Sequence, residues 1–322
     1  MKPQDRNWLL IALALLAVFA AYPAMASMSA VAGLRDVLLF ALFAVALDLF
    51  WGRTGILSFG HAAFFGLGAY GMAVFTIHLA PGAPWASLGG LGFAVALAGV
   101  VALVVGYFII FGSVRGAYFT IVTLALTLVA QQIAVGWSSV TGGDAGLIGV
   151  PPLWLGAPVT GLAFFYLVLV VLALVVFGLW WGLRGRRGLT LRAIEDDERK
   201  AQTLGYNTSA HLLATFVVSG LIAGLAGGLY ATGTGFVAPD MIALLLSTEV
   251  IMWVAVGGRG SLIGAVVGTI VVWQLQQRVS SLNASAWPLF IGGFFIAMVF
   301  LFPDGLPAAA RKLWASATRR QA

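Results

Sequence analysis

Residues Leu91–Phe111 have the sequence LGFAVALAGVVALVVGYFIIF, a run of 21 residues without a charged side chain. A helix of about 20 apolar residues crosses the hydrocarbon core of a bilayer, which is about 30 Å thick. Lipid offers the backbone no hydrogen-bond partner, so a segment this apolar must satisfy its N–H and C=O groups internally, as an α-helix does. The stretch therefore predicts a transmembrane helix, and with it a membrane protein.

The composition of the whole chain points the same way. Of its 322 residues, 61% are hydrophobic and 9% are charged, whereas soluble domains are about 25% charged. The mean hydropathy is +1.03. The lack of cysteine excludes disulfides and thiolate metal sites, and the histidines (His61, His78 and His211) are too widely spaced to predict a metal site. The composition thus excludes an ordinary soluble protein.

The N-terminus resembles a secretory signal, because Lys2 and Arg6 precede an apolar run and Ala24-Met25-Ala26 stands where a cleavage site would be. We expect this segment to be retained, since it completes a series of membrane spans. The ten candidate spans are Trp8–Ala26, Val31–Trp51, Ile56–Leu79, Leu91–Phe111, Ala117–Trp137, Val159–Leu183, Leu212–Phe236, Ile242–Val256, Leu262–Gln277 and Trp287–Phe302.

Lysine and arginine are spread unevenly over the connections between these spans. With the N-terminus inside, fifteen of the seventeen basic residues lie in the cytoplasm, and Arg35 and Arg278 are the exceptions. One helix more or fewer midway would break this asymmetry, so the positive-inside rule supports ten spans, with both termini cytoplasmic. The inside connections are those near Arg53, Arg115, Arg184–His211 and Arg259, together with the basic tail 307–322.

The predicted fold is an all-α polytopic membrane protein, a single transmembrane domain over residues 1–322. Ten helices divide into two sets of five, approximately residues 1–150 and 151–310. Because each set has an odd number of spans, the second set runs inverted relative to the first, which is a common plan among transporters. The segment 184–211 is the one substantial cytoplasmic loop.

The fifth span carries a polar stripe. Thr120, Thr123, Thr127 and Gln131 lie within about 80° of one another around the helix, on an otherwise apolar segment. A polar face in a membrane helix must meet protein or a wet cavity. The stripe therefore either lines a transport path or holds neighbouring helices together.

Four further polar side chains are candidates for the substrate path: Ser58, His61, Asp48 and Glu249. Ser58 and His61 are three residues apart where a glycine-rich third span begins, so we expect them on one face of the helix. Dense glycine permits a break in a helix or a close approach. Asp48 and Glu249 are acids inside apolar segments, where an unpaired charge is costly. Each acid is therefore a transport candidate or a member of an interhelical bond.

The cytoplasmic loop 184–211 has the pattern of a short surface helix. Thr190 is placed to cap its start and Gly205 to end it. Opposite charges four residues apart pair Glu195 with Arg199 and Asp196 with Lys200. A partial apolar face suits docking to a cytoplasmic partner, although a solvated connector would also fit; its members are Leu191, Ile194, Ala201 and Leu204.

The sequence has no GxxxxGK[ST] phosphate-binding loop, and Gly257-Gly-Arg-Gly260 lacks both its spacing and its lysine. No nucleophile–base–acid set or pair of carboxylates is placed for catalysis. We therefore expect that this chain is not an enzyme, binds no metal and carries no cofactor of its own.

Several segments together resemble the permease subunits of ATP-binding cassette importers for branched-chain amino acids, urea and related amides. The resemblance covers nearly the whole chain after the first span. Its pieces are Gly55–Tyr70 (GILSFGHAAFFGLGAY), Arg115–Thr120 (RGAYFT), Thr141–Leu147 (TGGDAGL), Leu191–Glu198 (LRAIEDDE), Leu204-Gly205, Ser219–Tyr230 (SGLIAGLAGGLY), Val256–Leu262 (VGGRGSL) and Phe302–Leu306 (FPDGL).

The resemblance implies a bacterial inner-membrane system with a second, similar permease, two cytoplasmic ATPases that hold ATP and Mg²⁺, and a periplasmic substrate-binding protein. The segment Thr190–Gly205 is similar to the coupling helix that sits in a cleft of the ATPase. The coupling residues that it implies are Leu191, Arg192, Ile194, Glu195, Asp196, Asp197, Glu198, Leu204 and Gly205.

The sequence leaves the substrate open. Asp48–Gly52 (DLFWG) and Glu249–Gly260 (EVIMWVAVGGRG) resemble members for urea more than members for amino acids, yet the chain is shorter than typical urea permeases. The alternative from another class is an ion-coupled secondary transporter or a channel that uses Asp48 or Glu249. That class would give no reason for the charged cytoplasmic loop.

Overall fold

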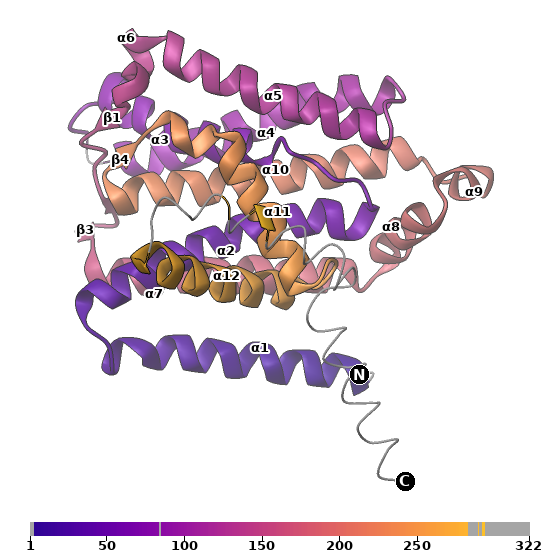
Figure 1. Ribbon diagram of the computed structural model, residues 1–322, viewed down its shortest axis with the longest axis horizontal. Helices are drawn as coiled ribbons and strands as arrows, with labels where there is room; N and C mark the ends of the chain where they lie inside the picture. The colour runs from indigo at the N-terminus through magenta and orange to yellow at the C-terminus, as the bar shows by residue number, and fades with distance from the viewer. Residues whose placement is uncertain (1–2, 84, 283–288, 290–291, 294–322) are drawn as a thin grey trace.

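The computed structural model describes residues 3–83, 85–282, 289 and 292–293, and within them the chain is a helical membrane protein (Figure 1). Seven of its helical segments are long and apolar enough to cross a bilayer. They are α2 (Met28–Thr54), α3 (His61–Val74) with the π-helical η2 (Phe75–Leu79), α4 (Ala86–Phe111), α5 (Ala117–Gly136), α7 (Gly161–Leu183), α10 (Thr208–Thr234) and α12 (Leu262–Leu282).

Each of these seven segments overlaps an expected span. The first expected span, Trp8–Ala26, corresponds to the apolar part of α1 (Pro3–Ala21) and the 3₁₀ turn η1 (Tyr22–Ala24). The expected tenth span, Trp287–Phe302, falls almost wholly outside the described residues, and the tail 307–322 does so entirely.

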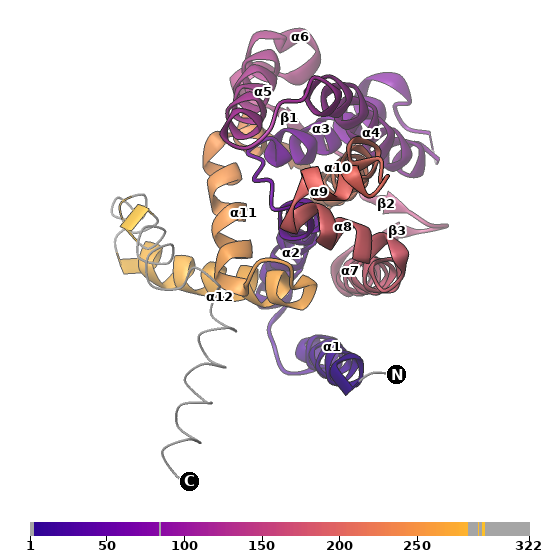
Figure 2. The same ribbon diagram turned by 90° about the vertical axis from the view of Figure 1, so that its right-hand side faces the viewer.

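The core of the bundle lies around α2 and α10, which pack against each other. α10 also contacts α3 and α4, while α2 contacts α7, α12 and the shorter α11 (Leu244–Gly257). The long helices run side by side, α1 lies along the outside next to α7, and α5 lies on the opposite side of the bundle (Figures 1 and 2). Leu38, Phe43 and Leu47 of α2 are fully buried in this core.

Small side chains allow α10 to approach its neighbours closely. A Cβ atom at Gly220 would lie 2.6 Å from the Cβ of Ala102, and one at Gly228 would lie 3.1 Å from the Cβ of Ala94. A Cβ at Gly224 would similarly meet the Cβ of Ala98 on α4, and one at Gly68 of α3 would meet the backbone of Gly224. Glycines four residues apart thus serve as a packing face, which is how small residues act between membrane helices.

The helix α11 (Leu244–Gly257) departs from the expected eighth span, Ile242–Val256. It has 14 residues, and at about 1.5 Å per residue it is about 21 Å long, shorter than the hydrocarbon core. It runs across the bundle between α5 and α12 rather than along the long helices (Figures 1 and 2). The 3₁₀ turn η4 (Pro239–Ile242) precedes it.

The chain segment that connects α5 to α7 has little regular structure and lies at one end of the bundle (Figure 1). There the short helix α6 (Ser138–Thr141) and the turn η3 (Gly143–Ala145) lead into β1 (Leu147–Ile148), which pairs antiparallel with β4 (Phe236–Val237). A hairpin follows, formed by β2 (Leu153–Trp154) and β3 (Pro158–Val159).

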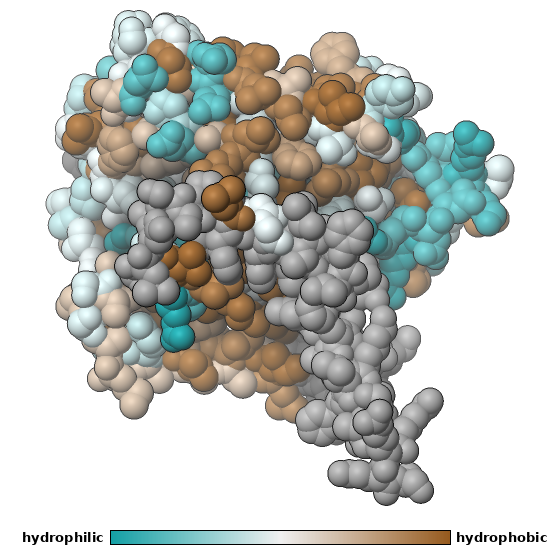
Figure 3. Space-filling view, in the orientation of Figure 1, coloured by the Kyte–Doolittle hydropathy of each residue, from teal (hydrophilic) through white to brown (hydrophobic). Residues whose placement is uncertain are grey.

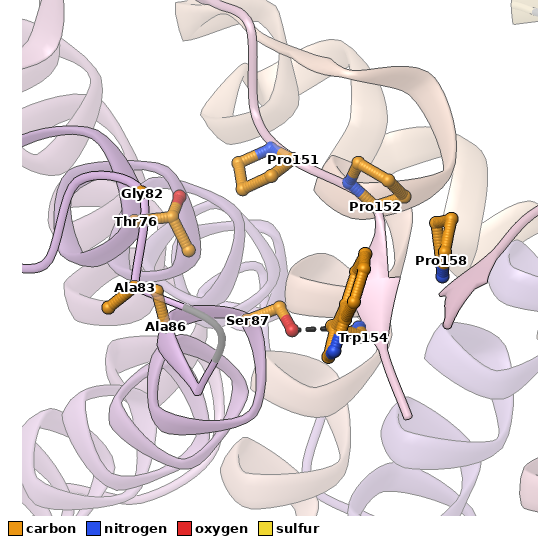
Figure 4. Close-up of a pocket in the computed structure, with 9 residues that line it drawn as sticks. All are labelled: Thr76, Gly82, Ala83, Ala86, Ser87, Pro151, Pro152, Trp154 and Pro158. Carbon is orange, nitrogen blue, oxygen red and sulfur yellow. Dashed lines mark hydrogen bonds between the residues drawn. The ribbon is translucent and has the colours of Figure 1, made fainter. Parts of the chain in front are cut away.

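This hairpin borders a pocket of about 330 Å³ at the end of α3 and the start of α4 (Figure 4). The Trp154 backbone N–H donates to Ser87 Oγ across it at 2.8 Å, and three prolines of the hairpin region form one wall. The loop segment is thereby fixed to the bundle.

The opposite end carries the polar loop, as two helices: α8 (Arg186–Asp196) and α9 (Glu198–Thr203). They project from the bundle as a hydrophilic patch (Figures 1 and 3). The single helix predicted from Thr190 to Gly205 is wrong, because the backbone of Asp197 is extended and breaks it. The Asp197 carboxylate accepts a hydrogen bond from the Lys200 N–H at 3.0 Å and caps α9.

Other details of the predicted loop helix change accordingly. Thr190 is not a cap; it lies inside α8, where its hydroxyl donates to the Arg186 carbonyl at 3.0 Å. Gly205 does end the second helix, with a φ of +89° that favours glycine. Leu191, Ile194 and Ala201 of the predicted apolar face are buried within this chain, so they are not open to a partner, whereas Leu204 is 74% exposed.

Candidate functional site

The third span contains an unwound segment at its start. α2 ends at Thr54 and α3 begins only at His61, so residues 55–60 are not helical. Ser58 therefore lies ahead of the helix and shares no helical face with His61, contrary to the expectation. Unwound backbone inside a membrane needs other partners for its polar groups, and these come from α5 and α11.

Phe59 is the centre of this contact. Its carbonyl accepts hydrogen bonds from Thr127 Oγ1 and from Ser247 Oγ, both at 2.7 Å, and its N–H donates to Thr123 Oγ1 at 3.2 Å. Thr120 Oγ1 donates to the Leu57 carbonyl at 3.0 Å. Three threonines of the predicted stripe and one serine of α11 thus hold a single non-helical segment.

The stripe is therefore partly used for interhelical bonding. Thr123 and Thr127 are fully buried, whereas Thr120 and Gln131, towards the two ends of α5, are half-buried. The outer face of α5 is apolar and exposed, with Ile121 at 60%. Whether this face borders a transport path in an assembled transporter stays a prediction.

His61 lies in the core between α3, α10 and α2. Ser219 Oγ donates its one hydrogen to the Ala46 carbonyl at 2.5 Å, so it can only accept from the His61 ring, whose Nε2 lies 2.5 Å away. This assigns the hydrogen of the neutral imidazole to Nε2. The rings of Phe50, Phe64 and Phe216 surround it at centroid distances of 6.1, 5.8 and 6.0 Å.

Ser58 is buried and completes the unwound segment. Its hydroxyl accepts a hydrogen bond from the Gly60 N–H at 3.2 Å. A Cβ at Gly60 would lie 3.2 Å from the Cβ of Thr123, a tight contact that glycine avoids where α5 approaches. The structure thus places Ser58 beside the α5 threonines and places His61 on the other side, in the α2–α10 core.

The two intramembrane acids each bind a neighbouring helix. Asp48 is fully buried, and its Oδ1 accepts a hydrogen bond of 2.6 Å from the Gly260 N–H in the turn between α11 and α12. Glu249 on α11 accepts a long hydrogen bond from Gln276 Nε2 of α12, at 3.4 Å. Asp48 thus ties α2 to the α11–α12 turn.

The polar loop is bound to the ends of several membrane helices. Arg115, between α4 and α5, makes a two-pronged contact with Glu198, with N–O distances of 2.8 and 2.9 Å. Thr208, at the start of α10, donates to the same carboxylate at 3.1 Å. Glu195 pairs with Arg259 of the α11–α12 turn at 3.4 Å.

These partners differ from the pairs predicted within the loop. Glu195 reaches Arg259 and Lys200 pairs with Asp197, because the break at Asp197 removes the continuous helix that the predicted spacing required. Arg115 and Arg259 mark inside connections in the sequence and stand in segments of the resemblance, but neither was predicted to bind the loop. Their proximity to the loop carries no local sequence signal.

The outward surface of the loop combines charged and apolar side chains. Leu189 and Leu204 are 66% and 74% exposed, and Arg192 and Asp196 are exposed beside them. Hydrogen bonds from the Lys200 N–H and its ammonium lower the pKa of the Asp197 carboxyl. The stability that this cap contributes is therefore fully present above the usual aspartate pKa, and it is lost as the pH falls through the lowered pKa. Leu189 is a surface feature that the sequence pattern missed.

Comparisons with known proteins bear on this arrangement. Residues 29–302 match the family described as branched-chain amino acid transport system / permease component. The high-affinity branched-chain amino acid transport system permease protein LivM of Salmonella typhimurium (strain LT2) is 27% identical over 92% of this chain and 74% of its own length. LivM of Escherichia coli K12 is 28% identical with the same coverage.

Another relative, which matches over a smaller part of the chain, is named for a different substrate. The autoinducer 2 import system permease protein LsrC of Photorhabdus luminescens is 29% identical over 51% of this chain and 50% of its own length. No solved structure matches the chain. The family match spans nearly all the described helices, the unwound segment and the α8–α9 loop, and the chain belongs to the family of branched-chain amino acid transport system permease components.

Proposed function

We propose that this chain works with a second, similar permease, two cytoplasmic ATPases and a periplasmic binding protein to carry branched-chain amino acids across the bacterial inner membrane. The family match and the LivM relatives support the permease role and this class of substrate. The proposed topology has ten spans in two inverted sets of five, with both termini in the cytoplasm. ATP and Mg²⁺ belong to the partner subunits.

The observation that carries the coupling role is the attachment of α8 and α9. Their inner side binds the α4–α5 turn through Arg115 and the α11–α12 turn through Arg259. Their outer side leaves Leu189 and Leu204 exposed. A displacement imposed by an ATPase on the outer side would therefore act on several membrane helices at once.

A connected series of contacts leads from this loop into the membrane. Arg259 lies in the same turn as Gly260, which binds Asp48, and this turn follows α11 directly. α11 in turn carries Ser247, which holds the carbonyl of Phe59 together with Thr127. We propose that α11 transmits movement of the loop to the unwound segment and to α5.

The deciding experiment is reconstitution of the chain with its partner subunits in proteoliposomes. We expect ATP-dependent uptake of labelled leucine or isoleucine when the cognate binding protein is present, and no uptake without ATP. Competition by excess valine and not by urea would fix the substrate class. ATP-dependent uptake of urea alone would refute an amino-acid substrate while leaving the permease role intact.

An ion-coupled carrier is not favoured. Family membership places the chain among permease components. The Asp48 carboxylate is engaged by the Gly260 N–H, and Glu249 is bound by Gln276. Uptake that persists without ATPase subunits and follows an imposed proton gradient would support the carrier instead.

A further inference from the structure

A groove of about 550 Å³ lies between α7 and α10, directly beneath α8. The transport role proposed above makes no use of it. Small residues form its two sides, namely Gly178 and Gly182 on α7 and Ala210 and Ala214 on α10, and all four are exposed. A Cβ built at either glycine would meet nothing within 4 Å. The groove is therefore an open apolar channel along the membrane helices.

One end of the groove is basic. Arg187 of α8 and His211 of α10 line it there, and Arg184 and Arg186 stand beside Arg187 in the sequence. The remaining lining is mainly aliphatic, with Leu179 and Leu183 on α7 and Leu191 on α8. The groove thus combines an apolar length with a cationic end, which is complementary to a lipid that has an anionic head.

Aromatic side chains set the depth of the basic end in the membrane. Trp180 and Trp181 lie in the last turn of α7, and tryptophan is enriched where the bilayer meets water. The Arg184 guanidinium stacks over the Trp180 ring at 3.4 Å. Arg187 lies three residues beyond Arg184, so we place it at the level of the phospholipid headgroups. Gly182 then lies level with the tryptophans, where the acyl chains begin, and Gly178 lies one turn deeper.

We propose that this groove binds one anionic phospholipid, with an acyl chain between α7 and α10 and the phosphate against Arg187. Basic pockets between membrane helices are suited to such headgroups. The bound lipid would also contact Leu191, so it would support the inner side of α8 at the point where the loop leaves the membrane. The coupling loop would then depend on the lipid composition of the bilayer.

The test compares binding of phosphatidylglycerol and phosphatidylcholine with identical acyl chains to the full-length chain in detergent, by native mass spectrometry. The wild-type chain should retain phosphatidylglycerol in preference. Arg187→Gln should weaken that binding about fivefold, the effect of about 1 kcal/mol per basic residue at a membrane surface. The matched control is Arg199→Gln, because Arg199 is exposed on α9, away from the groove.

A second variant tests the acyl-chain part independently of charge. Gly182→Leu should fill the groove and reduce binding of both lipids, whereas Gly92→Leu should not, because Gly92 is an exposed glycine of α4 with the same open space around its Cβ. Equal retention of both lipids by the wild-type chain, or wild-type binding by Gly182→Leu, would overturn the proposal.

The remaining outcome concerns another occupant. The native chain has no cysteine, so Gly182→Cys gives a single site for a thiol-reactive cross-linker in the assembled transporter. Cross-linking of this cysteine to a partner subunit would show that the groove is a protein interface, and would refute the lipid site. Reaction with a thiol-reactive lipid probe alone supports it.

Discussion

At the scale of single residues, Glu198 joins the loop to the membrane helices through two partners. Its carboxylate receives the Arg115 guanidinium and the Thr208 hydroxyl, and its side chain is 22% exposed. A charged hydrogen bond in such a half-buried place contributes about 1.5–3 kcal/mol. Asp196, two residues earlier, is exposed.

Glu198→Ala should therefore lower leucine uptake and transport-linked ATP hydrolysis in proteoliposomes, and lower the thermal stability of the purified chain. Asp196→Ala removes the same charge from the exposed surface and should leave thermal stability unchanged. Arg115→Ala should reproduce the Glu198→Ala defect, and the double variant should lose little more, because both remove one contact. Fully additive losses would contradict a direct pair.

His61 and Ser219 give a second prediction at this scale. Ser219→Ala removes the hydroxyl that receives the His61 Nε2–H and donates to the Ala46 carbonyl. Buried groups left without a partner cost about 1–3 kcal/mol each. The purified variant should melt at a lower temperature, measured by differential scanning fluorimetry, while Ser139→Ala on exposed α6 should not. An unchanged melting temperature would show that these two hydrogen bonds do not stabilise the core.

At the scale of elements, the α4–α10 contact depends on glycine. The glycines of α10 that are spaced four residues apart meet alanines of α4 that the sequence alone did not single out. Gly224→Val would force its side chain into Ala98 and should reduce the yield of folded protein in detergent, because overpacking costs about 1–3 kcal/mol or more. Gly92→Val, on an open face of α4, is the control. Equal yields would show that the two helices separate readily.

Cysteine labelling along α5 tests whether this helix borders the transport path. If its polar face borders the path, single cysteines at Thr120 and Gln131 in the assembled transporter should react with a water-soluble thiol reagent. Cysteines at Ile121 and Ile133 should not, since these side chains lie on the apolar outer face. Thr127→Cys, bound to the Phe59 carbonyl at rest, should react only during ATP turnover. Reaction at every position alike would make the stripe a packing feature.

At the scale of the whole molecule, the basic residues Arg115 and Arg259, which the sequence assigned to inside connections, lie with the α8–α9 loop at one end of the bundle. Salt bridges link Arg115 and Arg259 to the α8–α9 loop, and the β2–β3 hairpin lies at the other end. The proposed orientation follows from this separation and from the positive-inside rule.

Labelling of intact cells checks that orientation. An impermeant thiol reagent should modify a cysteine at Gly156, in the exposed β2–β3 hairpin, and should modify one at Arg199 only after the membrane is made permeable. The two sites are both exposed, so they are matched for access. The reverse pattern would place the loop outside the cell and rule out cytoplasmic coupling.

The sequence by itself determined the class of fold, most of the membrane helices and the polar loop. Runs of apolar residues and the placement of Lys and Arg report local transfer energies, which need no knowledge of neighbours. The resemblance carried by segments such as Gly55–Tyr70 also gave the family, which the match over residues 29–302 shows.

Only the tertiary structure decided where the polar groups are satisfied. The break at Asp197, the crosswise α11 and the unwound residues 55–60 all depend on partners distant in sequence: Arg115 and Arg259 for the loop, and Thr123, Thr127 and Ser247 for Phe59. In a medium without water, a backbone group leaves a helix only where another part of the chain can bind it. Such a partner is set by three-dimensional packing, and no local pattern encodes it.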